Sequence, residues 1–270
     1  MLVTSLACEK PEEEIVPVPP PAETTAPVKQ PELTEGVKSK TSLDFDSELY
    51  QYAKFKNLVY RILVPRNYDS TQLYPLHLFL HGIQERGSDN EQQLSVGGAQ
   101  FQVDSIRNKY PSFIIFPQCP ATYYWFDDPV TQDLTGLIDS LVTNLNIDEK
   151  KISIGGYSMG AYGTFAMVAQ NSGLFKTAVA ISGDGDEDKA SLMAKTSWQI
   201  FAGKKDHVVS SSKSENMAKA LKKAGATVSF ILYPEADHNR TWLKAFSEPD
   251  FFSLLFSKNK GSSGGNGNQR

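Results

Sequence analysis

From residue 58 to residue 258 the chain alternates short, continuous apolar runs with longer segments of helical periodicity. The apolar runs, which we predict to be strands, are 58–65, 76–82, 112–118, 151–156, 177–183, 198–203 and 228–234. The segments that we predict to be helices are 131–146, 159–170, 212–225 and 250–258. Continuous apolar strands alternating with amphipathic helices are typical of a mainly parallel sheet with helices on both faces. The pattern therefore predicts an α/β fold.

The two ends of the chain differ from this body. Seven of the 15 prolines and seven glutamates lie in residues 9–40, without an aromatic residue, so this stretch cannot bury enough apolar surface to fold. We predict a disordered tether over 9–42, a catalytic domain over 43–259 and a flexible tail over 260–270. Residues 1–8, which end in Ala-Cys, are similar to a truncated lipoprotein signal and predict lipidation at Cys8 and an envelope or surface location in a bacterium.

Overall composition excludes some partners. The net charge is −4 and no large basic cluster occurs, which argues against nucleic acid as a partner. No apolar run is long enough to span a membrane, so membrane attachment would depend on Cys8. The other cysteine, Cys119, belongs to no Cys/His cluster, and we expect a buried thiol there, with neither a metal nor a cofactor.

One serine stands where the run at 151–156 meets the helical segment at 159–170. Ser158 lies between Gly156 and Gly160 in a G-x-S-x-G pattern, which in a strand–turn–helix context lifts a serine hydroxyl clear of the sheet. Ligands bind beyond the carboxyl ends of parallel strands. We therefore predict that Ser158 is a nucleophile.

A serine hydroxyl needs a base, and the chain has four histidines. His77 lies inside a predicted strand, and His81 opens the loop after it, where we expect a hydrogen-bonding strut. His238 follows the last predicted strand, from which it can reach Ser158, so we predict that it is the base. His207 is the remaining candidate, and its role stays open.

The acid that orients the base is expected between serine and histidine in chain order. We predict Asp206, which follows a buried strand, with Asp184 as the alternative. An oxyanion hole would take one backbone N–H from Met159, next to the nucleophile, and a second from Ile83 in the loop after an earlier strand.

The motifs HGIQERGSDN, FPQCP with Trp125, GGYSMGAYGTF, GKKDHVV and DHNRTW occur in this order. Together they resemble the α/β-hydrolase superfamily, and the chain is most similar to bacterial feruloyl and acetyl esterases, dienelactone hydrolases and polyhydroxybutyrate depolymerases. Many of these are described only as peptidases or esterases. The resemblance implies an α/β-hydrolase fold, with Ser158, Asp206 and His238 as the triad and with Ile83 and Met159 as oxyanion donors.

Two positions depart from the family pattern. Gln84 stands where the loop motif has glycine, which would either change the conformation of the loop or place a side-chain amide near the substrate. His207 stands where proline commonly follows the acid. We also predict that Glu85 and Arg86 form a pair that braces this loop.

The aromatic cluster at 123–128 also suggests a binding role. Trp125 is predicted either to line a subsite or to anchor the loop on the sheet, and Gln118 at the same strand end is predicted to contact substrate.

The sequence thus predicts a serine carboxylic-ester hydrolase without a large lid. Acyl or feruloyl esters of polysaccharides are the expected substrates, and the oligomeric state is open. A serine peptidase or a polyester depolymerase is the alternative. A catalytically silent, carbohydrate-binding surface lipoprotein is the alternative from another class.

Overall fold

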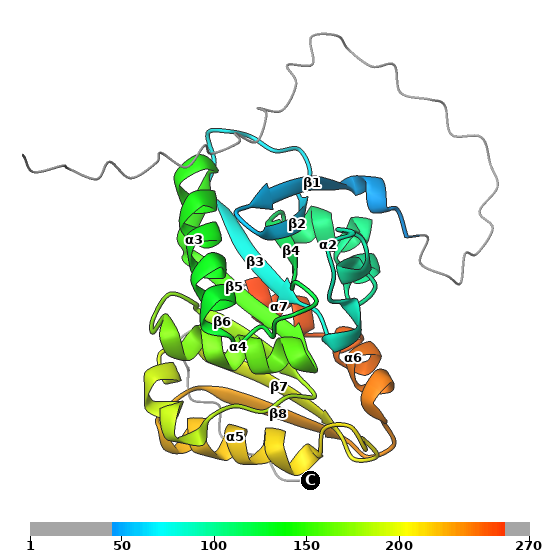
Figure 1. Ribbon diagram of the computed structural model, residues 1–270, viewed down its shortest axis with the longest axis vertical. Helices are drawn as coiled ribbons and strands as arrows, with labels where there is room; N and C mark the ends of the chain where they lie inside the picture. Colours follow the sequence, from blue (N-terminus) through cyan, green and yellow to red (C-terminus); the bar gives the residue numbers. More distant parts are fainter. Residues whose placement is uncertain (1–44, 257–270) are drawn as a thin grey trace, which may run out of the picture. The chain divides into compact units, whose positions relative to one another are not determined.

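The computed structural model describes residues 45–256, which form one mixed eight-stranded sheet with helices on both faces (Figure 1). The expected signal and tether, the tail and the boundaries at 43 and 259 lie outside the described residues. None of the helices within 45–256 is long and apolar enough to cross a membrane. The α/β-hydrolase-like fold predicted from the alternation is confirmed.

The strand order is β1-β2-β4-β3-β5-β6-β7-β8. The strands are β1 Tyr50–Phe55, β2 Leu58–Leu63, β3 Tyr74–Leu80, β4 Phe113–Gln118, β5 Ile147–Tyr157, β6 Thr177–Ile181, β7 Ser197–Gly203 and β8 Val228–Tyr233. Strand β1 pairs antiparallel with β2, and β2 pairs antiparallel with β4, whereas the remaining pairs are parallel. The carboxyl ends of β3 to β8 therefore meet at one edge of the sheet.

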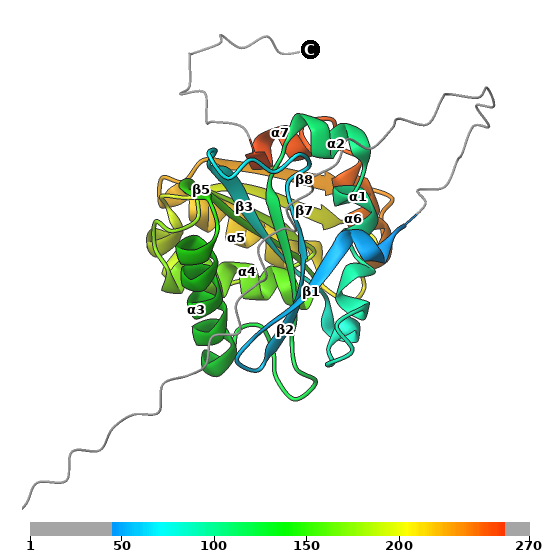
Figure 2. The ribbon, with the colours of Figure 1, turned by 90° about the horizontal axis from the view of Figure 1, so that it is seen from above.

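Two layers of helices bury the two faces of the sheet, as the view in Figure 2 shows. On one face lie α3 Asp128–Asn144, α4 Met159–Gln170 and α5 Ser211–Lys223. On the other face lie α1 Gly98–Phe101, α6 His238–Phe246 and α7 Phe251–Phe256, with α2 Asp104–Lys109 on the same side. Short 3-10 helices, Ser47–Leu49, Ile83–Glu85, Gln92–Leu94 and Glu187–Met193, occupy the connections.

Strand β5 is the centre of the fold. From Ile152 to Tyr157 it is buried, and its partners β3 and β6 are buried along most of their length. Such a strand cannot shift without exposing its apolar side chains, so the turn at its carboxyl end is held rigidly. Ser158 is the first residue of that turn.

Four of the helices and strands were not expected from the sequence. Strand β1 is an edge strand that is largely exposed, and α1 and α2 are short. Helix α6 begins at His238, where only a connection after the last strand was expected. The last helix is Phe251–Phe256, and residues 257 and 258 of its expected span lie outside the described residues.

Candidate active site

Ser158 occupies the sharp turn between β5 and α4. Its backbone angles, φ 54° and ψ −120°, lie in a region that residues other than glycine rarely adopt. Such a conformation costs about 1–3 kcal/mol and persists only where the surrounding structure over-determines it. Here the Ser158 N–H donates to the Ile181 carbonyl of β6 at 2.9 Å, and the Ser158 carbonyl accepts from Ala161 at the start of α4.

The glycines around Ser158 allow this turn to form. A Cβ on Gly156 would lie 2.3 Å from the backbone of Gly160. A Cβ on Gly160 would lie 1.9 Å from the carbonyl oxygen of Leu80 in β3. Both positions therefore exclude any side chain, and the glycine pattern is explained by the close approach of α4 to two strands.

The side chains of Ser158, His238 and Asp206 form a hydrogen-bonded chain. His238 Nδ1 lies 2.7 Å from Asp206 Oδ2, and His238 Nε2 lies 2.9 Å from Ser158 Oγ. A carboxylate only accepts, so Nδ1 carries a proton that it donates to Asp206. In the neutral ring Nε2 then accepts from the Ser158 hydroxyl. The structure thus brings together the three residues that the sequence predicts as a triad.

Asp206 is held as an anion. Its Oδ1 accepts from the backbone N–H groups of Val208 at 2.9 Å and Val209 at 2.8 Å. Burial by itself raises the pKa of this carboxyl, but the hydrogen bonds from His238, Val209 and Val208 outweigh it and hold the pKa below its usual value. The anion fixes the imidazole and would stabilise its protonated form.

Asp184, the alternative acid, and Asp237, the neighbour of His238, are engaged elsewhere. Asp184 Oδ2 pairs with the Lys213 ammonium at 3.3 Å, and its Oδ1 accepts from the Gly185 N–H. Asp237 caps the start of α6 by accepting from the Arg240 N–H at 2.8 Å. The structure therefore favours Asp206 over Asp184 as the partner of His238.

The Tyr157 ring lies against the imidazole of His238, a contact that the sequence did not predict. The rings of Tyr157 and His238 lie 4.9 Å apart, and the Tyr157 hydroxyl is 3.1 Å from Asn239 Oδ1, to which it donates. Burial, followed by the charges of Asp206, Glu85 and Asp237, raises the pKa of Tyr157, so it stays a neutral donor. The only signal in the sequence was its place beside the nucleophile.

The predicted oxyanion donors lie at the starts of two elements. Met159 is the first residue of α4, and Ile83 begins the 3-10 helix that follows β3. Neither N–H donates to another residue within 45–256, so both remain available. The amino-terminal end of α4 carries the positive end of the helix dipole, which favours negative charge there.

His81 braces the loop that carries Ile83. Its Nδ1 donates to the Gly82 carbonyl at 2.6 Å, and its Nε2 accepts from the Cys119 N–H at 3.0 Å. Burial lowers the pKa of this histidine to about 4, so it is neutral at pH 7. The strut predicted at His81 is confirmed, as is the burial of Cys119.

Two expected substrate contacts need correction. Trp125 is fully buried, and its indole N–H donates to the His81 carbonyl at 3.0 Å, so it anchors the loop and offers no surface to a ligand. Gln118 is buried as well, where it accepts from the Asn90 N–H at 2.7 Å and donates to the Glu85 carbonyl at 3.1 Å. Gln84 is exposed on the same loop, and its contact with substrate stays a prediction.

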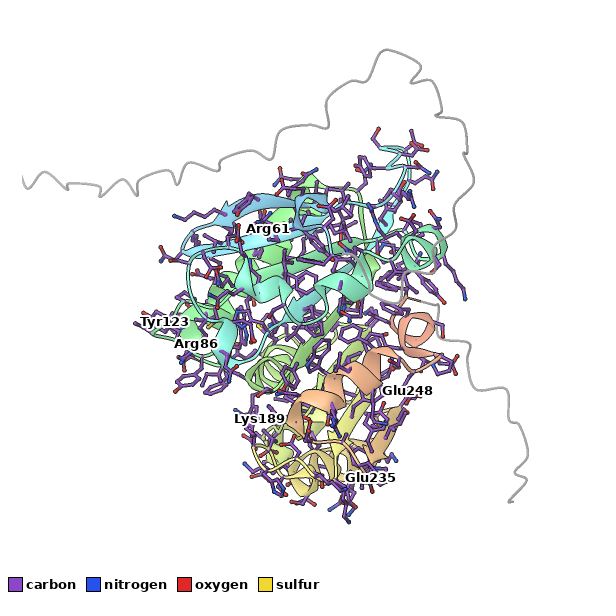
Figure 3. The ribbon with its side chains drawn as sticks, turned by 90° about the vertical axis from the view of Figure 1, so that its right-hand side faces the viewer. Arg61, Arg86, Tyr123, Lys189, Glu235 and Glu248 are labelled. Atoms are coloured by element: carbon purple, nitrogen blue, oxygen red, sulfur yellow. The ribbon has the colours of Figure 1, made fainter. Side chains whose placement is uncertain are left out.

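The predicted Glu85–Arg86 pair is also wrong, because no such ion pair occurs among the described residues. Arg86 braces the loop through carbonyls instead. Its guanidinium donates to the carbonyl of Ile83 at 3.2 Å and to the carbonyl of Tyr123 at 3.2 Å, and Figure 3 shows Arg86 and Tyr123 side by side.

Two further expectations concern His207 and metal binding. His207 is exposed on the loop after β7. Within residues 45–256 no group of three His, Cys, Asp or Glu side chains is placed to hold a metal ion.

Comparisons with known proteins show what the chain is similar to. Residues 123–246 match the dienelactone hydrolase family. A thermostable esterase of known structure is 28% identical with a TM-score of 0.74, over 78% of this chain and 63% of the esterase. The chain thus spans less than two thirds of that esterase. No curated protein matches the sequence.

More distant structures share the fold. A CE1 ferulic acid esterase from Anaeromyces mucronatus, in complex with ferulic acid, is 16% identical with a TM-score of 0.58, over 77% of this chain and 88% of that one. An acylaminoacyl peptidase from Pyrococcus horikoshii is 15% identical with a TM-score of 0.61, over 80% and 43%. At 15–16% identity these two structures show the fold alone, whereas the family match and the 28% identical esterase support a hydrolase of the dienelactone hydrolase or esterase type. Together with the sheet order, the family match and the 28% identical esterase place the chain in the α/β-hydrolase superfamily.

Proposed function

We propose that this protein is a serine carboxylic-ester hydrolase. The observation that carries the proposal is the hydrogen-bonded chain from Ser158 Oγ through His238 to Asp206, at 2.9 and 2.7 Å. A hydroxyl, an imidazole and a buried carboxylate in this order are the parts that acyl transfer requires.

In the proposed reaction, Ser158 Oγ attacks the ester carbonyl carbon while His238 Nε2 accepts the hydroxyl proton. The carbonyl electrons move to oxygen, to which the N–H groups of Met159 and Ile83 donate. Collapse of this intermediate breaks the bond to the alcohol, which leaves with the proton from His238. Water then attacks the acyl-serine, with His238 as base, and releases the acid and Ser158.

The proposed substrates are acyl or feruloyl esters of polysaccharides. The support is the motif resemblance; the ferulic acid esterase, at 16% identity, supports the fold alone. The same triad could also hydrolyse the ester bonds of a polyester, so a polyester remains the alternative substrate. Peptidases also share the fold, but at 15% identity this likeness supports the fold alone.

Replacement of Ser158 by alanine tests the function. We expect hydrolysis of 4-nitrophenyl acetate and methyl ferulate to fall by about 10⁴-fold or more in kcat, because no other residue can form the acyl-enzyme. A fluorophosphonate should label the wild-type protein and leave the variant unlabelled. A peptide anilide cleaved faster than either ester would favour a peptidase. A wild-type protein that takes no label would favour the silent carbohydrate-binding alternative.

We also propose that lipidation at Cys8 holds the enzyme at a bacterial envelope or surface. The proposal is supported by the Ala-Cys sequence and by the Pro/Glu-rich stretch after it. Incorporation of labelled palmitate, absent after Cys8→Ser, is the measurement that checks it.

A further inference from the structure

The loop that carries Ile83 is hydrogen-bonded to a buried glutamine. Gln118, the last residue of β4, is 1% exposed, although glutamine side chains are mostly found on protein surfaces. Its Nε2 donates to the Glu85 carbonyl at 3.1 Å and to Asp89 Oδ1 at 3.2 Å. Its Oε1 accepts from the Asn90 N–H at 2.7 Å. Both ends of the amide are therefore engaged with the segment that follows β3.

These partners fix the orientation of the amide. Turned by half a revolution, the Gln118 amide would place its oxygen against the Glu85 carbonyl and its N–H groups against the Asn90 N–H. Gly87 brings the loop against the same amide, because a Cβ there would lie 3.2 Å from Gln118 Nε2. The Gly87 N–H also donates to the Cys119 carbonyl at 3.0 Å, so backbone and side chain together join the loop to the end of β4.

Asn90 is held in turn by four hydrogen bonds. Its φ of 57° lies in the left-handed region, which residues other than glycine adopt at a cost. Its N–H donates to Gln118, and its Nδ2 donates to the Tyr60 carbonyl at 3.1 Å. Its Oδ1 accepts from Gln93 Nε2, and its carbonyl accepts from Arg61 Nε at 2.6 Å. Partners from β2, β4 and a 3-10 helix thus over-determine this residue.

Arg61, in β2, fixes the Asn90 carbonyl from the other side. The side chain is buried, and a buried charge is costly unless it is well partnered. Its Nη1 donates to the Tyr50 carbonyl at 2.7 Å, and its guanidinium lies 3.4 Å from the centre of the Tyr52 ring. Glu91 Oε1 lies 3.7 Å from Nη2. The planar guanidinium is therefore a rigid donor that cannot turn away from Asn90.

The network holds the far end of the 3-10 helix that begins at Ile83. His81 braces the start of this helix through the Gly82 carbonyl, and Gln118 braces its last residue through the Glu85 carbonyl. A three-residue helix fixed at both ends leaves its first N–H, that of Ile83, little freedom to turn. An oxyanion donor is effective when it is preorganised, because it then needs no reorganisation as negative charge develops.

We propose that Gln118, held by Asn90 and Arg61, is a positioning residue that fixes the direction of the Ile83 N–H in the oxyanion hole. The inference rests on the proposed ester hydrolysis, and it adds the residues that keep this donor in place. The negative charge on the carbonyl oxygen develops only in the transition state. Loss of the Gln118 contact should therefore lower kcat and leave KM nearly unchanged.

Kinetics of Gln118 variants test this role. Gln118→Glu keeps an oxygen for the Asn90 N–H but puts a second oxygen where an N–H group faces the Glu85 carbonyl. We expect kcat on 4-nitrophenyl acetate to fall about 10–100-fold, with KM within about threefold of the wild-type value. Gln118→Met, which has a similar length and no charge, should show a comparable loss of kcat.

A third variant tests the network without changing Gln118. Asn90→Gly accepts the left-handed φ and keeps the backbone contacts with Gln118 and Arg61, but it loses the two side-chain contacts. We expect a loss of kcat smaller than that of either Gln118 variant, again with little change in KM. This variant decides the matter even where a Gln118 variant does not fold.

The matched control is Gln199→Glu, the same chemical change at another buried strand glutamine. Gln199 lies in β7, and its Nε2 has no hydrogen-bond partner within residues 45–256. We expect kcat within about threefold of the wild-type value, whatever the change in stability. Equal losses of kcat in Gln199→Glu and Gln118→Glu would overturn the proposal. So would a rise in KM with kcat unchanged, because Gln118 would then serve substrate binding.

Amide hydrogen exchange of the full-length protein separates this proposal from the proposed function. In Gln118→Met the Gly87 N–H should exchange about tenfold faster or more than in the wild-type protein, whereas the amides of β5 should keep their rates. This result is expected even if the wild-type protein hydrolyses no ester. Unchanged exchange at Gly87 in a folded variant would overturn the proposal and leave the proposed hydrolysis standing.

Discussion

A histidine lies at the edge of the sheet on each side of Ser158, one after β8 and one after β3. The two histidines have different kinds of hydrogen-bond partner. On the β7–β8 flank, His238 contacts a carboxylate and a hydroxyl, and 13% of its side chain is exposed. On the β3–β4 flank, His81 is fully buried between a backbone carbonyl and a backbone N–H. The first ring has an anion to stabilise its protonated form, and the second has none. The partners of a histidine, more than its distance from the nucleophile, decide whether it can move a proton.

The other residues of the flanks follow the same division. The β7–β8 flank carries charge, with Asp206 held by two N–H groups and by His238. The β3–β4 flank carries backbone N–H groups and aromatic rings. One side therefore suits proton transfer and the other suits binding of the oxyanion.

The largest expected effect comes from breaking the charged flank. Asp206→Asn keeps the size of the side chain but removes the anion and favours the wrong imidazole tautomer. We expect kcat on 4-nitrophenyl acetate to fall about 10⁴-fold. Asp184→Asn, the matched change on the loop after β6, should alter kcat by less than about threefold. Comparable losses in the two variants would contradict the assignment of Asp206.

An intermediate effect is expected on the neutral flank. His81→Leu leaves the Gly82 carbonyl and the Cys119 N–H without a partner in a buried place. Each lost partner costs about 1–3 kcal/mol, so the free energy of unfolding should fall by roughly 2–5 kcal/mol in urea denaturation. The acid limb of the pH–rate profile should stay where it is in the wild-type protein. A stable variant whose profile loses that limb would show that His81 is a base.

The smallest effect concerns the dependence of stability on pH. The folded pKa of Asp206 lies below its ordinary value of 3.8. Asp206 therefore contributes stability that is fully present above that value and is lost as pH falls through the folded pKa. We expect the difference in unfolding free energy between wild type and Asp206→Asn to shrink between about pH 5 and pH 2 in urea titrations. A difference in unfolding free energy that grows on acidification would contradict this prediction.

Several parts of the site could be predicted because they depend on local chemistry or on chain order. Gly156 and Gly160 reveal a turn at Ser158 in the sequence itself, since only glycine fits where α4 meets β3. Asp206 and His238 were found because each follows a strand, and parallel strands end at one edge. Helix α6 was missed because its buried residues, Thr241, Ala245 and Phe246, are few among polar neighbours. Strand β1 was missed because an edge strand lacks a continuous apolar run.

By itself, the sequence determined the α/β alternation, the strained turn at Ser158 and the order of the three residues that meet there. Only the tertiary structure decided which side chains of one loop face inward. Tyr124, Trp125 and Phe126 are consecutive aromatic residues, and composition cannot distinguish them. Trp125 is buried because Gly163 and the His81 carbonyl leave it a place, and its neighbours are thereby turned to the surface. That choice depends on contacts between residues far apart in the chain, which no local pattern contains.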